Sequence, residues 1–168
     1  MSKKVLVAYA SKYGATEQIA EKIALRLKKA GLNVIVQPVK TVTSVIGYDA
    51  VVLGSGVYAG FWIRAASDFL KQQEAALTGI PVWLFSDGPT GEGNPKELME
   101  GFTLPENLKP LAERIAPRDT AFFHGVIDMD KLRFAEKLVI RALKAPTGDF
   151  RDWDMINDWA DRVANELE

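Results

Sequence analysis

The chain has 168 residues, 48% of them hydrophobic, and 21 Lys and Arg stand against 22 Asp and Glu for a net charge of -1. This length and composition fit one globular domain, residues 1–168, and exclude disordered and fibrous classes. The near-neutral charge provides no field that would attract nucleic acid. Because cysteine is absent, thiolate metal sites, iron–sulfur clusters and cysteine nucleophiles are excluded, and any redox activity needs a bound cofactor.

The amino terminus carries no signal for export. The apolar run 5–10 ends in Ser11 and Lys12 without a small-residue cleavage pattern. No apolar stretch approaches the ~18 residues that are needed to span a bilayer. We therefore expect a cytoplasmic protein without a transmembrane segment.

Five short runs rich in aliphatic and β-branched residues predict strands, at residues 4–8, 33–39, 50–53, 81–85 and 120–125. Several are apolar at successive positions, which is typical of a parallel sheet covered on both faces. Helices are predicted at residues 16–30, 63–73, 105–115, 130–143 and 153–167. The order, β-α repeated five times, predicts a doubly wound α/β fold.

Sheets of this kind bind ligands beyond the carboxyl ends of their strands. We therefore examine three loops: the first loop, residues 11–16, the second loop, residues 54–62, and the third loop, residues 86–93. In the first loop, the hydroxyls of Ser11, Tyr13 and Thr16 surround Gly14 at the start of the best predicted helix, with Lys12 at the rim. Such a helix end favours a phosphate, although a simple helix cap would show the same residues.

The second loop combines glycine with aromatic residues. Its glycines allow close approach of the backbone, and Tyr58, Phe61 or Trp62 can stack on a flat ring. Alternatively, the rings of Phe61 and Trp62 pack beneath the following helix. The spacing of Gly54, Gly56 and Ala59 also fits a dinucleotide fingerprint, with Asp87 as the ribose ligand.

The third loop has three glycines and a proline within eight residues, so it can wrap the edge of a ligand or form a plain flexible turn. His124 is the only histidine of the chain. At the end of a predicted strand we interpret it as structural rather than catalytic. No phosphate-binding Walker sequence, metal-ligand cluster or nucleophilic triad can be assembled.

Residues 9–16, with the second and third loops, resemble the FMN-binding loops of flavodoxin-like proteins, and the resemblance extends over nearly the whole chain. It implies a three-layer α/β/α sandwich with a five-stranded parallel sheet in the order 2-1-3-4-5. More narrowly, residues 124–127, 131–143 and 148–153 are similar to the menaquinone-dependent protoporphyrinogen dehydrogenase branch.

The resemblance also implies the cofactor, FMN, with its phosphate on the first loop and its ring between the second and third loops. Tyr13 stands where flavodoxins usually have Thr. No catalytic side chain and no metal are implied. The implied FMN contacts are Ser11, Lys12, Tyr13, Gly14, Ala15, Thr16, Ser55, Gly56, Val57, Tyr58, Ala59, Gly60, Ser86, Asp87, Gly88, Pro89, Thr90 and Gly91.

Three functions remain open at this point. The first is electron transfer through bound flavin with a redox partner protein. The second is an FMN-dependent enzyme that passes electrons from a porphyrinogen-type molecule to a quinone, which the near-neutral charge favours over a strongly acidic electron shuttle. The third is a nicotinamide-dinucleotide dehydrogenase built on the fingerprint of the second loop.

Two surface features concern partners. The predicted helix 130–143 carries Arg133, Lys137 and Arg141 at four-residue steps, with apolar residues on another side. Either this face is solvated above the core, or it contacts an anionic surface such as membrane headgroups or porphyrin propionates. Exposed aromatic residues such as Trp62 would suit a homodimer contact.

Overall fold

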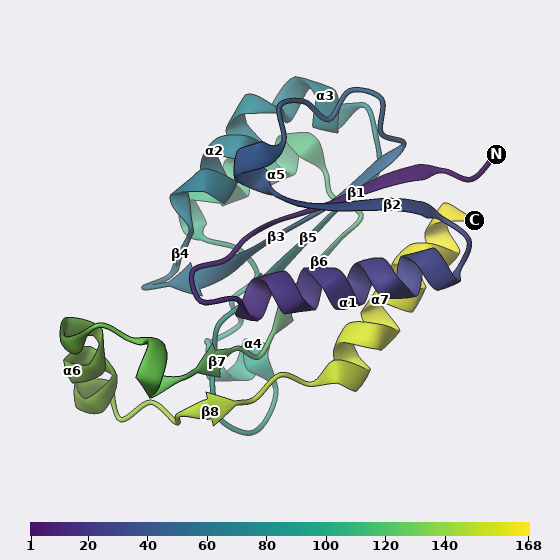
Figure 1. Ribbon diagram of the computed structural model, residues 1–168. Helices are drawn as coiled ribbons and strands as arrows, with labels where there is room; N and C mark the ends of the chain where they lie inside the picture. The colour runs from purple at the N-terminus through teal and green to yellow at the C-terminus, as the bar shows by residue number, and fades with distance from the viewer.

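The centre of the fold is a parallel sheet between two layers of helices, seen in a computed structural model that describes residues 1–168 (Figure 1). Its strands are β1 Lys4–Ala10, β2 Asn33–Pro38, β3 Ala50–Tyr58, β5 Val82–Asp87 and β6 Asp119–Phe123. They lie in the order β2-β1-β3-β5-β6. The three-layer sandwich and its strand order, 2-1-3-4-5 among the parallel strands, are confirmed.

Helices cover both faces of the sheet, and β1, β3 and β5 are therefore buried along almost their whole length. On one face lie α1 (Ala15–Lys29) and α7 (Trp153–Leu167), and Trp159 of α7 packs edge-on against Phe85 and Phe123 of the sheet. The other face is covered by α2 (Arg64–Gln72), α3 (Glu74–Thr78) and α5 (Lys109–Ile115) (Figure 1). Each layer closes its own apolar core.

The β-α alternation is less regular than the sequence predicts. A single 3-10 turn, η1 (Val39–Thr41), follows β2 in place of a helix. A short strand, β4 (Phe61–Trp62), pairs antiparallel with the end of β3. Between β5 and α5 the chain forms α4 (Pro95–Leu98) and the 3-10 turn η2 (Glu106–Leu108).

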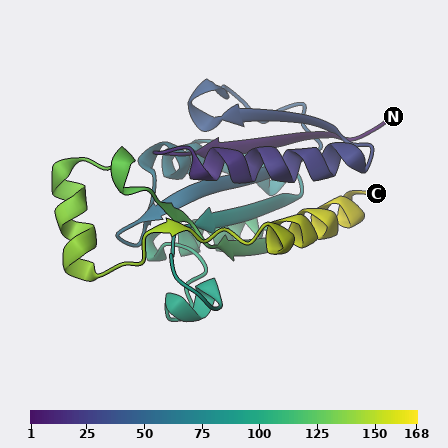
Figure 2. The same cartoon turned by 60° about the horizontal axis from the view of Figure 1, so that its bottom comes forward.

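An arm, residues 126–149, extends from the sheet between β6 and α7. Its base is a hairpin of β7 (Val126–Ile127) and β8 (Gly148–Asp149), and its tip holds the 3-10 turn η3 (Met129–Lys131) and α6 (Phe134–Leu143). Both views show α6 standing away from the sheet (Figures 1 and 2). No residue of α6 is buried.

The arm corrects two expectations. The predicted helix 130–143 is not continuous, because Leu132 and Arg133 adopt extended backbone and separate η3 from α6. Its apolar side does not lie above the core either, since α6 has no core beneath it. The amphipathic pattern is real, but packing against the sheet is not its cause.

We expect Gly54→Ala to destabilise the fold, because a Cβ there would lie 2.0 Å from the ring of Phe85. Overpacking of a core usually costs about 1–3 kcal/mol of unfolding free energy, and here the rigid ring must move. Urea unfolding measures the loss. Gly79→Ala is the control, since its Cβ would meet nothing closer than 3.8 Å; equal stability of the two variants would contradict the packing argument.

Candidate functional site

The parallel sheet brings the three loops together at the edge where β1, β3 and β5 end (Figure 1). The Thr16 hydroxyl of the first loop donates to the Asp87 carboxylate of the third over 2.6 Å. A Cβ on Gly56 of the second loop would lie 3.3 Å from the same hydroxyl. The predicted site residues of all three loops therefore form one region.

The first loop ends in an uncapped helix. Gly14, at φ 95, is the N-cap of α1, and no side chain caps the helix. The Gly14 N–H donates to Ser11 Oγ over 2.9 Å, and the next N–H with a backbone acceptor is that of Gln18. The amides of residues 15–17 point from the positive end of a four-turn helix without protein acceptors, which is the arrangement that binds anions.

Asp87 lies beneath this helix end. Its side chain is buried at the carboxyl end of β5. Burial raises the pKa of Asp87 to about 7, although the hydrogen bond from Thr16 and the charge of Arg151 oppose the shift. A carboxyl group of this kind is largely protonated below neutral pH, which limits the negative charge under the amides.

The second loop is a hairpin. β3 continues to Tyr58, and the chain turns at Ala59 and Gly60, both at positive φ, before β4 returns. This two-residue turn with left-handed backbone at both positions suits a hairpin. Tyr58 and Phe61 are exposed at its tip.

Trp62 does not lie on the surface. Its side chain is only 5% exposed, and Nε1 donates to Ser86 Oγ over 2.7 Å. The expectation of an exposed Trp62 at a dimer contact is therefore wrong, and the alternative that the ring packs inside is confirmed. Phe61, which is 58% exposed, is the aromatic residue that β4 turns outward.

Two of the predicted contact residues, Ser55 and Ser86, are fully buried. Ser55 Oγ accepts from the Ile63 N–H over 3.0 Å and donates to the Gly56 carbonyl, while Ser86 holds Trp62. Their hydroxyls fix the hairpin to the sheet. Gly56 is also buried, and the surface of the second loop is formed by the remaining predicted residues, Val57 to Gly60.

The third loop is held by close backbone contacts. A Cβ on Gly125 would lie 2.9 Å from the Gly88 carbonyl, so only glycine lets these loops approach. The Gly125 N–H donates to the Pro89 carbonyl over 2.9 Å. His124 is buried with its ring nitrogens 3.3 Å from the Pro89 carbonyl and 2.6 Å from the Gly93 carbonyl. These contacts fit a structural role for His124.

The arm contacts the first loop through a carboxylate that the sequence did not reveal. Glu136 of α6 accepts a hydrogen bond from the Tyr13 hydroxyl over 2.6 Å and forms an ion pair with Lys12 over 2.9 Å. These two contacts, that with Tyr13 first, lower the pKa of Glu136 to about 2. Lys131 of the arm also donates to the Tyr13 carbonyl over 3.4 Å.

Arg151 forms a second connection at the base of the arm. Its largely buried guanidinium is paired with Asp149 and donates to the Gln18 side chain over 2.6 Å and to the Ala15 carbonyl over 3.3 Å. No local pattern marks the contacts of Glu136 and Arg151 with the region of the first loop, because Tyr13 and Gln18 lie more than 100 positions away in the chain. The first loop and the arm are thus connected at two points, through Glu136 and through Arg151.

An open hollow of about 550 Å³ lies on the outer side of the third loop, between Gly91–Gly93, His124 and residues 150–154. It contains none of residues 11–16 or 55–60. The helix end and the loop contacts, rather than this hollow, therefore mark the candidate site.

The dinucleotide spacing lacks its structural context. Gly54 and Gly56 lie inside β3, Ala59 lies in the hairpin turn, and α2 begins only at Arg64. The fingerprint requires a strand, a tight turn and a helix that starts at the glycines. The structure does not provide this arrangement, so the nicotinamide hypothesis loses its motif.

Comparison with known proteins decides the family. The flavodoxin domain matches residues 6–154. The chain belongs to the flavodoxin domain family. A flavodoxin from the domain Archaea superimposes with a TM-score of 0.67 at 13% identity, covering 98% of each chain. A Streptococcus pneumonia TIGR4 flavodoxin gives 0.62 at 15% identity, covering 97% of this chain and 99% of its own.

Among curated proteins, the protoporphyrinogen IX dehydrogenase [quinone] of Escherichia coli strain K12 is 20% identical over 96% of this chain and 95% of its own length. As a flavodoxin domain, the chain is an FMN-binding protein that transfers electrons through the flavin. None of its helices combines the length and the hydropathy that crossing a bilayer requires.

We expect the stability of the fold to depend on pH through Asp87. Because its pKa is about 7 in the folded chain against 3.8 ordinarily, its contribution is fully present below the unfolded pKa and is lost as the pH rises through the folded pKa. Asp87→Asn should therefore be nearly neutral at about pH 4 and stabilising by on the order of 2–4 kcal/mol at about pH 8.

Urea unfolding across this pH range measures the effect, with the exposed Asp158→Asn as the control. A difference between Asp87→Asn and the parent that stays constant over the range would contradict a raised pKa.

We expect Glu136→Gln to loosen the arm, because the neutral amide loses the ion pair with Lys12 and weakens the acceptor for Tyr13. Trypsin should then cut the arm severalfold faster, since cleavage follows local opening. Glu106→Gln, which breaks a surface ion pair with Lys109, is the matched control. Equal cleavage of both variants would show that Glu136 does not fasten the arm.

Proposed function

We propose that the chain holds the FMN phosphate on the first loop and the flavin ring between the hairpin of the second loop and the backbone of the third. The observation that carries this proposal is the free helix end: three amides of α1 without acceptors, behind Gly14 in left-handed conformation, at the carboxyl edge of the sheet. The other 15-residue helix, α7, is capped by the side chain of Asp152.

The residues present fit the phosphate of FMN. A Cβ on Gly14 would have nothing within 4 Å, so the space beside this N-cap residue is open. Ser11 adds a hydroxyl that accepts from the Gly14 N–H and keeps a proton to donate, whereas the Thr16 hydroxyl already donates to Asp87. Lys12 adds a cation at the rim although Glu136 shares it. In this family member Tyr13 supplies a hydroxyl to the arm rather than to the open space.

In this proposal the flavin ring is held by Tyr58 and by the backbone of residues 88–91. Although the Tyr58 side chain is 41% exposed, its hydroxyl end lies against Gly56, and the loss of solvent there, followed by the charge of Asp87, raises the pKa of Tyr58 above its ordinary value. The phenol of Tyr58 therefore stays neutral. It can stack on the flavin ring without placing a negative charge beside it. When bound, FMN supplies one- and two-electron chemistry, while the chain binds it, orients it and excludes water from it.

FMN and riboflavin, which lacks the phosphate, distinguish this site from general flavin binding. We expect FMN to bind on the order of 100-fold more tightly, since charge-assisted hydrogen bonds to amides are lost with the phosphate. Ala15→Asp places a carboxylate at the helix end. It should weaken FMN binding strongly, leave riboflavin binding unchanged and leave stability intact, because acidic residues suit a helix N-terminus.

Ala75→Asp, the same change in the first turn of α3, is the control, because α3 lies away from the three loops (Figure 1). Flavin fluorescence quenching measures both ligands. Equal affinities for FMN and riboflavin in the parent chain, or an Ala15→Asp variant that binds FMN normally, would contradict the placement of the phosphate.

A second candidate function is the transfer of electrons from a porphyrinogen-type molecule to a quinone. The full-length similarity to the Escherichia coli dehydrogenase supports it. So does the cationic arm beside the first loop, because Lys131 and Arg133 could pair with carboxylate groups of a substrate. A protein electron carrier needs no such element.

Anaerobic mixing separates the two functions. A porphyrinogen should bleach the flavin of the loaded protein, and a menaquinone analogue should restore its colour, if the chain is the enzyme. Exchange only with a reduced redox protein, without bleaching by porphyrinogen, would establish the carrier function instead.

A further inference from the structure

One side of α6 is apolar and has no partner in the fold. Glu136, Lys137 and Ile140 are half-buried and mark the side that faces the protein. The opposite side carries six exposed residues with no charge among them: Phe134, Ala135, Leu138, Val139, Ala142 and Leu143. Phe134 and Leu143 are 74% and 70% exposed, and Val139 and Leu138 are 56% and 49% exposed.

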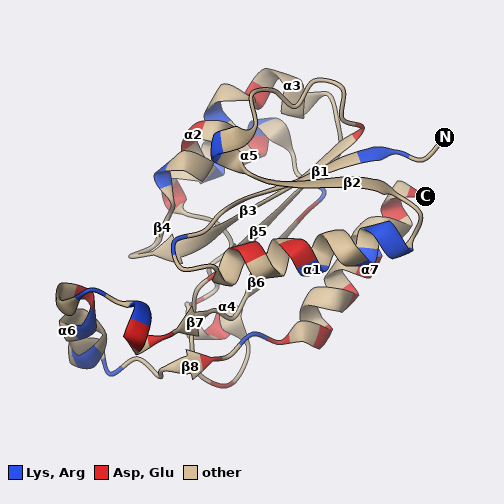
Figure 3. Ribbon diagram, in the orientation of Figure 1, with Lys and Arg blue, Asp and Glu red and all other residues tan.

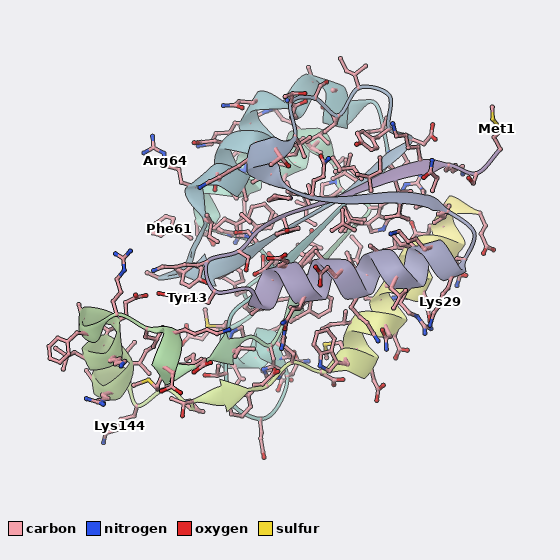
Figure 4. All side chains as sticks on the ribbon, in the orientation of Figure 1. Met1, Tyr13, Lys29, Phe61, Arg64 and Lys144 are labelled. Atoms are coloured by element: carbon pink, nitrogen blue, oxygen red, sulfur yellow. The ribbon has the colours of Figure 1, made fainter.

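The contacts of Glu136 fix this orientation. Because Glu136 is bound to Tyr13 and Lys12, α6 cannot turn its apolar side toward the sheet without breaking both contacts. Figure 4 shows Tyr13 between the sheet and α6. The outward position of the apolar residues is therefore a consequence of specific bonds, and it needs an explanation outside the folded chain.

Cations surround the apolar side. Residues 131–144 contain five, Lys131, Arg133, Lys137, Arg141 and Lys144, against the single carboxylate of Glu136, a net charge of +4. The whole chain has a net charge of -1, so the remaining residues carry -5. Figure 3 shows basic residues on α6 and on the turn that precedes it, with acidic residues beside them. The excess of cations is confined to this segment, because Asp128, Asp130 and Asp149 reduce the net charge of the whole arm, residues 126–149, to +1.

We propose that α6 docks this protein on an anionic lipid bilayer, with Phe134, Leu138, Val139 and Leu143 among the acyl chains and the surrounding cations at the headgroups. A protruding helix with one apolar side and flanking Lys and Arg has the pattern of amphipathic helices that lie in the membrane interface. A second copy is a poor occupant, because residues 131–144 of each copy carry a net charge of +4, and two such segments would repel each other where their apolar sides meet. The inference does not depend on FMN binding.

Docking by α6 would bring the candidate site close to the lipid. The arm and the hairpin tip with exposed Phe61 lie at the same end of the molecule, where the three loops meet (Figures 2 and 4). The acidic remainder of the chain would be repelled by the same surface. The molecule would therefore bind with its loops toward the bilayer, where a lipid-soluble electron acceptor dissolves.

Vesicle flotation of the full chain tests the proposal. Vesicles of phosphatidylcholine with about 30% phosphatidylglycerol should bind the protein, and vesicles of phosphatidylcholine alone should bind it at least tenfold more weakly. Leu138→Glu should reduce binding about tenfold or more, since a charge enters the apolar side. Arg141→Gln should reduce it about fivefold, the value of one cation at such a surface.

Leu25→Glu is the matched control, because Leu25 is 45% exposed on α1, outside the arm; it should bind like the parent. Circular dichroism and FMN affinity report folding separately. Equal binding to neutral and anionic vesicles, no binding to either, or full binding by Leu138→Glu would overturn the proposal. So would a dimer in solution that Leu138→Glu dissociates, which would assign the apolar side to a second copy.

Discussion

The parallel alignment of five strands is the constraint on which this structure depends. It places the carboxyl ends of β1, β3 and β5 at one edge, so three loops far apart in the sequence meet there. Because parallel strands need crossovers, a helix must start near that edge, and α1 does so without a cap. The amides of residues 15–17 have no acceptor in the protein, and we propose that the FMN phosphate accepts from them.

The arm is the second feature on which the arrangement of the candidate site depends. It joins the first loop through Glu136 and through Arg151, so the loop that we assign to the phosphate is also the support of α6. Lys12 shows the consequence most directly, since it lies 5.2 Å and 5.5 Å from the ring centres of Tyr13 and Tyr58 while it pairs with Glu136. Lys12 therefore contacts the hairpin through Tyr58 and the arm through Glu136, and so connects both to the first loop.

Much of the fold could be predicted because its signals are local. Successive apolar residues mark buried parallel strands, and the three- and four-residue spacing of Ile19, Ile23 and Leu27 marks the inner side of α1. The glycine-rich loops could be predicted for the same reason. Residues 11–16, 56–60 and 87–91 lie together as expected, while their contacts with FMN remain a proposal.

The failures concern long-range partners. Trp62 was considered as an exposed aromatic residue for a dimer contact, but its indole N–H donates to Ser86 of β5 and its ring is buried. The apolar spacing around Leu138 suggested a core helix, because amphipathic sequences that face a sheet and those that face outward look alike. Glu136 carried no signal, since a single carboxylate on a basic helix gains meaning only from Tyr13.

The most direct test of the account is an amide correlation spectrum of the chain, recorded by NMR while FMN is added. We expect the largest shifts at the amides of residues 14–17, with further shifts at residues 56–60 and 88–91. Riboflavin should reproduce the shifts of the second and third loops without those of α1. Shifts concentrated around residues 150–154, at the open hollow, with α1 unchanged, would contradict the phosphate site at the helix end.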